Sequence, residues 1–321
     1  MQPTPTPGFP VIVRFGFGLP LRDTNTNTLT MPALADPFDS FVNQAWSDHA
    51  EHADVVAARL HHVLPLVRDD DAAMRAAALA HHVMGEHLGR WRDGLDFMAR
   101  LFECGVHGPS GAASIARCQA SLRLCDGLAD ERGALSASDR CRVSAMAAAN
   151  LAALDAARAA HLLDDAMALA LDLPDADPAV RALAANSNGI AATLQELVSL
   201  QATPRSLMLK AAQVARSQWA RAGTWLEVER AEYRLALCWL AAGDAAQALH
   251  HARHCEAIVR ANGAVPLELF FAAEPLCLTA RALGHSSGQA AARAMAQQAF
   301  DALPAHDQAW CGATLDKINA S

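Results

Sequence analysis

Residues 219–263 read WARAGTWLEVERAEYRLALCWLAAGDAAQALHHARHCEAIVRANG, and this stretch decides the fold class because it predicts two helices joined by a tight turn. The first helix is expected over 226–242 and the second over 245–261. Gly243 favours the left-handed conformation that ends a helix, and Asp244 is a typical N-cap for the helix that follows. A turn this short makes the two helices antiparallel neighbours.

A capping box marks the start of the first helix, because Thr224 and Glu227 are spaced to satisfy free backbone N–H groups there. Along both helices, apolar side chains recur at steps of three or four, the pattern of one buried face. They are Val228, Ala231, Leu235, Cys238 and Trp239, and then Ala248, Leu249, Ala252, Cys255, Ile258 and Val259. Small side chains at Ala236 and Ala248 let the two backbones approach closely, while Trp239 fills the space beside them.

This helix pair resembles a tetratricopeptide repeat. The matching residues are Leu235 and Ala236 before Trp239, the Gly243-Asp244 turn, and the small Ala248 and Cys255. The sequence departs from the family at Ala252, where an aromatic residue is common, and at Arg260, where proline is common. Residues 222–236 also resemble bacterial proteins that contain such repeats, a likeness that brings no function with it. The resemblance implies a right-handed α-solenoid of antiparallel helix pairs.

The rest of the chain reads as further helix pairs. Helix starts are expected near 138, 178, 225 and 266, spaced by roughly 40 residues where the standard unit has about 34. The sequence therefore predicts an all-α fold of about five or six units with a C-terminal capping helix over 307–318. The repeat domain is expected over 36–321, beginning at Asp36-Pro37, and the pattern is clearest over 138–321. Pro275 is expected to kink or split its helix.

In the N-terminal part, three acidic residues at 69–71 favour a helix start, and that helix is expected to reach His87 and end at Gly89. Gly85 and Gly94 are expected to be positions of close approach between helices. Residues 1–35 are interpreted as a disordered or mis-assigned N-terminal tail, because MQPTPTPGFP and DTNTNTLT are low-complexity sequences. The apolar run between them lacks the features of a secretory signal.

Composition supports the helical prediction and narrows the partners. Hydrophobic residues make up 52% of the chain and aromatic residues only 5%, so the core must be built largely from alanine and aliphatic side chains. A net charge of −8 argues against nucleic acid as a partner, and the longest uncharged run, 182–195, is too short and polar to span a membrane. Eight cysteines without a CxxC pair are expected to be free buried thiols in a reducing cytoplasm.

Histidine doublets are the most conspicuous chemical feature of the sequence. His250 and His254 lie four residues apart, as do His251 and Cys255, which is a ligand spacing for zinc on a helix. No third ligand can be assigned, so we interpret each doublet as one packed and one solvated histidine. His49, near a helix start, is interpreted as part of a solvated face. The sequence shows no catalytic constellation, and we assign no catalytic residue, metal or cofactor.

The family resemblance implies a concave groove lined by the first helix of each pair. Carried over to this sequence, the groove residues are Asn186, Arg230, Tyr233, Arg234 and Leu237. Two arginines beside the only tyrosine suit a protein or peptide partner with an acidic group or a C-terminal carboxylate. The alternative is that Glu227 and Glu229 neutralise the arginines.

Three classes of function therefore stay open. The first is a non-catalytic scaffold that binds a protein or peptide in the groove, and an open, positively charged groove would favour it. The second is a regulatory sensor for a small ligand, favoured by an enclosed apolar pocket. The third is a metal- or cysteine-dependent enzyme on a helical solenoid, favoured by a bound zinc ion. Exposed helix faces are also compatible with a homo-oligomer.

Overall fold

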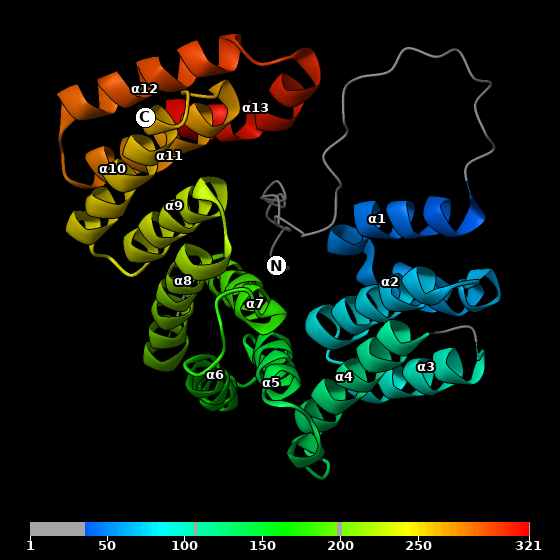
Figure 1. The fold of residues 1–321 in the computed structure, drawn as a ribbon. Helices are drawn as coiled ribbons and strands as arrows, with labels where there is room; N and C mark the ends of the chain where they lie inside the picture. The colour runs from blue at the N-terminus through cyan, green and yellow to red at the C-terminus, as the bar shows by residue number, and fades with distance from the viewer. Residues whose placement is uncertain (1–35, 106–107, 198–200, 321) are drawn as a thin grey trace, which may run out of the picture. The chain divides into compact units, whose positions relative to one another are not determined.

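The computed structural model describes residues 36–105, 108–197 and 201–320, and these residues form an all-helical protein (Figure 1). Thirteen α-helices and no strand are found within these ranges, which confirms the all-α part of the predicted fold. None of the described helices is both long enough and apolar enough to cross a membrane. The tail predicted for 1–35 lies outside the described residues.

The described chain divides into two compact units, and the division falls inside α7 (Pro178–Gln195). We call residues 36–186 the N-terminal unit and residues 187–320 the C-terminal unit. The N-terminal unit contains α1 (Pro37–Arg59), α2 (Asp70–Ala80), the π-helix η3 (His81–His87), α3 (Trp91–Glu103), α4 (Pro109–Cys125), α5 (Ala137–Leu151) and α6 (Ala156–Ala170). The C-terminal unit contains α8 (Ala202–Ala222), α9 (Trp225–Ala241), α10 (Ala245–Ala261), α11 (Pro266–Ala282), α12 (Ser286–Asp301) and α13 (Ala305–Asn319).

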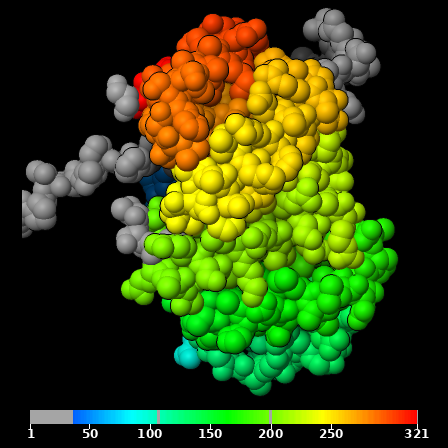
Figure 2. Space-filling view, turned by 90° about the vertical axis from the view of Figure 1, so that its left-hand side faces the viewer, coloured from blue at the N-terminus to red at the C-terminus, as the bar shows by residue number. Residues whose placement is uncertain are grey.

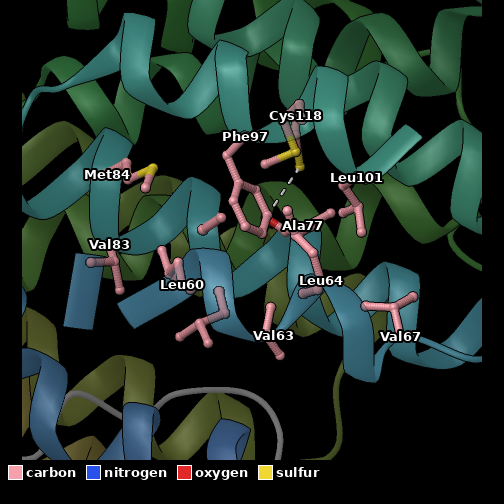
Figure 3. Close-up of a cluster of buried hydrophobic side chains, with 14 of the residues drawn as sticks. Leu60, Val63, Leu64, Val67, Ala77, Val83, Met84, Phe97, Leu101 and Cys118 are labelled. Atoms are coloured by element: carbon pink, nitrogen blue, oxygen red, sulfur yellow. Dashed lines mark hydrogen bonds between the residues drawn. The ribbon is translucent and has the colours of Figure 1, made fainter. Parts of the chain in front are cut away.

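The core of the N-terminal unit forms where alanine-rich α2 packs against α3 and α4. Phe97 of α3 is fully buried and fills the space between the small side chains (Figure 3). The Cys118 thiol of α4 lies 3.9 Å from the Ala77 carbonyl oxygen, which shows how closely α2 and α4 approach. Because alanine takes so little room, helices in this unit can pack at short distance with few aromatic residues.

The helix predicted from the acidic run to His87 is present, but its last part is a π-helix. Asp69 caps α2 by accepting from the Ala72 N–H at 2.8 Å, and the chain changes from α to π geometry at His81. The Leu88 N–H donates to the Val83 carbonyl oxygen, five residues back, as a π-helix requires. Periodicity of apolar residues could not reveal this change.

Gly85 and Gly94 are positions of close approach, as predicted. A Cβ atom on Gly85 would lie 2.7 Å from Asn150 Nδ2, and one on Gly94 would lie 2.9 Å from Leu122 Cδ1. Asn150 is buried in α5, where its Nδ2 lies 3.2 Å from His81 Nε2. The missing side chain at Gly85 therefore lets η3 lie directly against α5.

The helix pair that decided the fold class forms as predicted. The Thr224 hydroxyl accepts from the Leu226 N–H at 3.3 Å, and the Glu227 carboxylate accepts from the Thr224 N–H at 2.8 Å. Gly243 adopts φ of +87°, and Asp244 caps α10. Both helices begin and end within one residue of the predicted limits.

Successive helices of the C-terminal unit are neighbours in space. α9 packs on α10, α10 on α11 and α11 on α12, while α9 and α11 also meet directly. Figure 2 shows segments of this unit as adjoining bands whose colours run from lime green through yellow to orange in chain order. α10 is therefore held between two helices that also touch each other.

Pro275 does not split its helix, so of the two outcomes expected from the sequence, a kink or a split, the split does not occur. α11 runs without interruption from Pro266 to Ala282. It packs against α9, α10, α12 and α13, and Phe270, Ala273 and Cys277 are fully buried in these contacts. Packing on several sides outweighs the cost of a proline inside the helix.

Substituting Gly85 with alanine should destabilise the protein by about 1–3 kcal/mol, because the new methyl group overlaps the buried Asn150 side chain. Gly312→Ala in α13 is the matched control, since no atom lies within 4 Å of the added Cβ. That control should leave stability unchanged or raise it by up to about 1 kcal/mol. Urea unfolding followed by circular dichroism measures both. Equal effects of the two substitutions would refute the close contact.

Candidate binding face on helices α9 and α11

α9 lies inside the C-terminal unit, with most of its side chains removed from solvent. It packs against α8, α10 and α11. A helix covered on several faces is ordinarily apolar, because an unpaired buried charge is costly. α9 instead buries charged and polar side chains, which are Glu229, Glu232, Tyr233 and Arg234. Each of them therefore needs a partner on a neighbouring helix.

Arg230, the first predicted groove residue on α9, pairs with a carboxylate of α11. Its Nη2 donates to Glu268 Oε1 at 2.8 Å. The side chain of Arg230 is 32% exposed, whereas that of Glu268 is only 7% exposed. This ion pair joins α9 to α11 at the edge of the buried region.

Tyr233, the only tyrosine in the sequence, is buried and bonded to a second carboxylate of α11. Its hydroxyl donates to Glu274 Oε2 at 2.6 Å, and Lys317 Nζ donates to Glu274 Oε1, also at 2.6 Å. Burial raises the pKa of Tyr233 well above its ordinary value, and the neighbouring Glu274 adds to the effect. The hydroxyl therefore remains a donor, and one carboxylate links α9, α11 and α13.

Arg234 and Leu237 are almost fully buried, whereas a residue that lines an open groove is exposed to solvent. Arg234 is 3% exposed, and its Nη1 donates to Gln195 Oε1 of α7 at 2.6 Å. Leu237 is also 3% exposed and packs beside Cys255 and Val259 of α10. These two residues hold α9 against its neighbours.

Asn186, the fifth predicted residue, is not part of this arrangement. It belongs to the N-terminal unit, and its Nδ2 donates to the Ala182 carbonyl oxygen of its own helix at 2.8 Å. The structure thus brings together the four predicted residues of α9. Three of these four residues bond to partners that the sequence did not predict, and the fourth, Leu237, packs beside them. We call the bonded set the charged network: Gln195, Arg230, Tyr233, Arg234, Glu268, Glu274 and Lys317.

Arg230 and Arg234 bond to Glu268 and Gln195, whereas the sequence offered Glu227 and Glu229 as their partners. Glu227 serves the capping box, and Glu229 bonds to a cysteine, so Arg230 is paired by Glu268 instead. A signal for Glu268 and Glu274 exists in the sequence, because they are the only acidic residues in an otherwise apolar run, PLELFFAAEPLCL at 266–278. Acidic residues inside such a run are buried and must be paired.

Glu232 lies on the other side of α9, between α8 and α10. Arg216 Nε donates to Glu232 Oε1 at 2.8 Å, and His251 Nδ1 lies 2.6 Å from Glu232 Oε2. Burial alone would raise the pKa of Glu232, but the hydrogen bonds from His251 and Arg216 outweigh it and lower the pKa. Glu232 is thus a buried carboxylate held in its charged form.

Glu229 is the opposite case on the same helix. It is fully buried, and the Cys255 thiol donates to its Oε1 at 2.8 Å. Burial raises the pKa of Glu229 to about 8, and the charge of the nearby Glu268 contributes to the shift. Glu229 therefore holds a proton at neutral pH. A carboxyl group with so displaced a pKa is a common mark of a functional region.

An aromatic row runs beside the charged network. Tyr233 of α9 meets Phe271 of α11 edge to face, with ring centroids 6.0 Å apart, and Phe271 lies 5.2 Å from Trp310 of α13. Trp310 is 38% exposed, so the row passes from the buried Tyr233 to the surface. The aromatic row lies on α9, α11 and α13, which also carry every residue of the charged network except Gln195 of α7.

The zinc spacing noted on α10 is only partly retained in space. His250, His251 and His254 place one nitrogen each within 4.8 Å of one another, but Cys255 is buried beside Glu229. Cys255 and His251 therefore do not form a ligand pair. All eight cysteines are free thiols, and only Cys104 is exposed.

Two hollows in the N-terminal unit bear on the small-ligand alternative. One has a volume of about 390 Å³ and is lined by His61, Asp93, Asp96, Ala99 and Arg100. The other, of about 360 Å³, is lined by Leu64, Pro65, Arg100, Glu103 and Cys104. Both are open and charged, unlike the enclosed apolar pocket that a sensor of apolar ligands requires.

Glu229→Gln should flatten the pH dependence of stability. The folded state keeps a proton on Glu229 up to about pH 8, whereas the unfolded chain releases it near 4.5. The free energy of unfolding therefore falls as pH rises between these values. Glutamine cannot ionise, so the variant should exceed the parent protein at pH 8 by a few kcal/mol and resemble it at pH 5.

Glu232→Gln is the control for this experiment, three residues away on the same helix. Its carboxylate is charged and receives two charge-assisted hydrogen bonds, so its loss should destabilise the protein at pH 8. Urea unfolding at pH 5, 6.5 and 8 distinguishes the two. The same loss of stability in both variants at pH 8 would show that Glu229 holds no proton.

Comparison with known proteins adds nothing to this geometry. No protein-family model, curated protein or solved structure matches the chain. The resemblance to tetratricopeptide repeats therefore stays a hypothesis drawn from the sequence.

Proposed function

We propose that this chain is a non-catalytic binding protein, a TPR-like array of helix pairs that recognises a protein or peptide partner on the face formed by α9, α11 and α13. The observation that carries the proposal is that the aromatic row and the charged network both reach the surface on α13, at Trp310 and Lys317. Aromatic residues and arginine are enriched where proteins bind one another, because they combine apolar area with directed hydrogen bonds.

The spacing of contacts supports the repeat organisation in this proposal. Gln195 and Arg234 are 39 residues apart, Arg230 and Glu268 are 38 apart, and Tyr233 and Glu274 are 41 apart. These separations agree with the roughly 40 residues between expected helix starts. A stack of similar pairs, each bonded to the next, would produce this recurrence.

The exposed end of the face suits a partner with a carboxylate group. Lys317 holds Glu274 with its ammonium group, yet its side chain is 43% exposed. Lysine has three N–H donors, so a second carboxylate can bind at the same group. The exposed indole of Trp310 offers an apolar surface on the same helix. We therefore place the partner's acidic group or C-terminus at Lys317 rather than at the buried Arg234.

The raised pKa values of the buried thiols favour a binding function over cysteine catalysis. Burial raises the pKa of Cys118, Cys125 and Cys238 to about 12, so these thiols stay protonated and are poor nucleophiles at neutral pH. Burial likewise raises the pKa of Cys255 well above its ordinary value.

The test is selection from a random peptide library displayed with free C termini, followed by affinity measurements with the enriched peptides. Lys317→Gln and Trp310→Ala should each weaken binding at least about tenfold, equivalent to about 1.4 kcal/mol. Amidating the peptide C terminus should match the loss caused by Lys317→Gln if that carboxylate is the group recognised. Arg253→Gln, on the exposed surface of α10, should leave affinity unchanged.

Arg234→Glu is not an informative variant, because it would place an unpaired carboxylate at a buried position and disrupt the packing of the helices. Circular dichroism must therefore show that Lys317→Gln and Trp310→Ala retain the helical content of the parent protein. The proposal fails if no peptide is enriched, or if the enriched peptides bind all three variants equally.

A further inference from the structure

Three half-buried histidines meet in the N-terminal unit. His49 lies on α1, and His82 and His87 lie on η3. One ring nitrogen of each lies within 4.8 Å of the others. The ring centroids are 5.0 Å apart for His49 with either partner and 4.6 Å apart for His82 and His87. We call these residues the histidine triad.

Hydrogen bonds fix which nitrogen His49 and His82 can offer to a metal ion. His49 Nδ1 lies 2.7 Å from the Trp46 carbonyl oxygen, and a carbonyl oxygen can only accept, so the proton is on Nδ1. His82 Nδ1 lies 2.8 Å from Glu86 Oε2, and a carboxylate likewise accepts. In both rings the lone pair is therefore left on Nε2, the tautomer that suits metal binding through Nε2.

The nitrogens of His82 and His87 are already close to the separation that one metal ion imposes. His87 Nε2 lies 3.0 Å from His82 Nε2, and because His82 Nε2 carries a lone pair, His87 Nε2 is the donor in this hydrogen bond. A metal ion bound to both atoms would replace the hydrogen bond and leave the His87 proton on Nδ1. Two imidazole nitrogens bound to a tetrahedral zinc ion at about 2.0–2.1 Å are about 3.3–3.4 Å apart. A shift of a few tenths of an ångström would place an ion between them.

The π geometry of η3 is what brings these two rings together. In an α-helix, residues five apart point in directions that differ by roughly 140°. A π-helix bonds each residue to the fifth one along, so His82 and His87 are stacked on one side. Single π turns inside helices are frequent at functional sites, because they re-aim side chains in this way.

The π-helix that carries His82 and His87 is anchored in the core by its other residues. His81, the other member of the doublet, is buried and points away from the triad, with its Nε2 3.0 Å from the Ser121 hydroxyl and 3.2 Å from Asn150 Nδ2. Val83 and Met84 are buried in the core (Figure 3). Trp46 stands beside His49 and His82, each at 5.2 Å between centroids, and shields the triad on one side.

From this geometry we propose that His49, His82 and His87 bind a divalent transition metal ion, with zinc as the expected ion. Three neutral imidazole nitrogens are a common protein donor set for zinc, and they leave a fourth position for water or another ligand. Glu86 acts through His82 by holding the His82 ring and its tautomer, as outer-sphere carboxylates do. The site goes beyond the peptide face and does not depend on it, because it uses residues of the other unit.

The histidines of α10 provide an internal comparison. His250 and His254 are exposed, and their rings are 4.4 Å apart on consecutive turns of one helix. The third member of that cluster, His251, is half-buried and its Nδ1 bonds to Glu232. The histidine triad, by contrast, joins two different helices, all three of its rings are half-buried, and both His49 and His82 are bonded through Nδ1. We therefore expect tight binding at the triad and weaker binding at α10.

Zinc binding to the full chain, with any polyhistidine tag removed, should be measured by competition with a chromogenic chelator. The parent protein should bind one zinc ion tightly. His82→Gln and His87→Gln should each lower affinity by more than about 100-fold, and Glu86→Gln by about 10–100-fold. Cobalt should give the intense visible absorption of a tetrahedral site, and this absorption should be lost in His82→Gln.

The double variant His250→Ala, His254→Ala is the control and should keep the tight site. His49→Gln lies on a different helix from the other ligands and shows whether any loss at His82 comes from a damaged η3. The proposal is overturned if the parent protein binds zinc no more tightly than the triad variants do. It is also overturned if the tight site disappears in the His250→Ala, His254→Ala variant. In that case the triad is a hydrogen-bonded histidine stack.

Discussion

The C-terminal unit depends on one constraint, the burial of charged side chains on a helix that is covered by its neighbours. Because a buried charge without a partner is costly, each such side chain of α9 is matched from another helix. Arg234 reaches Gln195 of α7, Glu232 receives Arg216 of α8 and His251 of α10, and Tyr233 reaches Glu274 of α11. Each of these bonds joins α9 to a neighbouring helix, so together they favour one alignment of the helices around it.

The N-terminal unit, by contrast, is held together mainly by close packing of apolar side chains. Its core combines alanine with larger aliphatic side chains and a few phenylalanines, and helices packed so closely leave room for few irregularities. The π-helix at His81–His87 is one, and it is held by a glycine that lies against Asn150. The widened turn places three histidines together and turns a fourth into the core. Local backbone geometry thus determines which histidines can bind the same metal ion.

Sequence reasoning succeeded where structure is set by neighbouring residues. The capping box at Thr224, the Gly243 turn and the close approach at Gly85 all follow from local chemistry. It did not predict the partners of Arg230 and Tyr233, which lie 38 and 41 residues away in the sequence. It also missed the histidine triad, because α periodicity separates His82 from His87. Pro275 was wrongly expected to interrupt α11, since packing around that helix cannot be judged from one segment.

The account rests on the claim that the buried polar groups of α9 are energetically coupled to α11. A double-mutant cycle of Tyr233→Phe and Glu274→Gln, measured by urea unfolding, tests it most directly. The two groups are buried and 2.6 Å apart, so we expect a coupling free energy of about 1–3 kcal/mol. Additive effects, with no coupling beyond about 0.5 kcal/mol, would contradict the account. The charged network would then be a set of separate contacts that does not hold the helices in register.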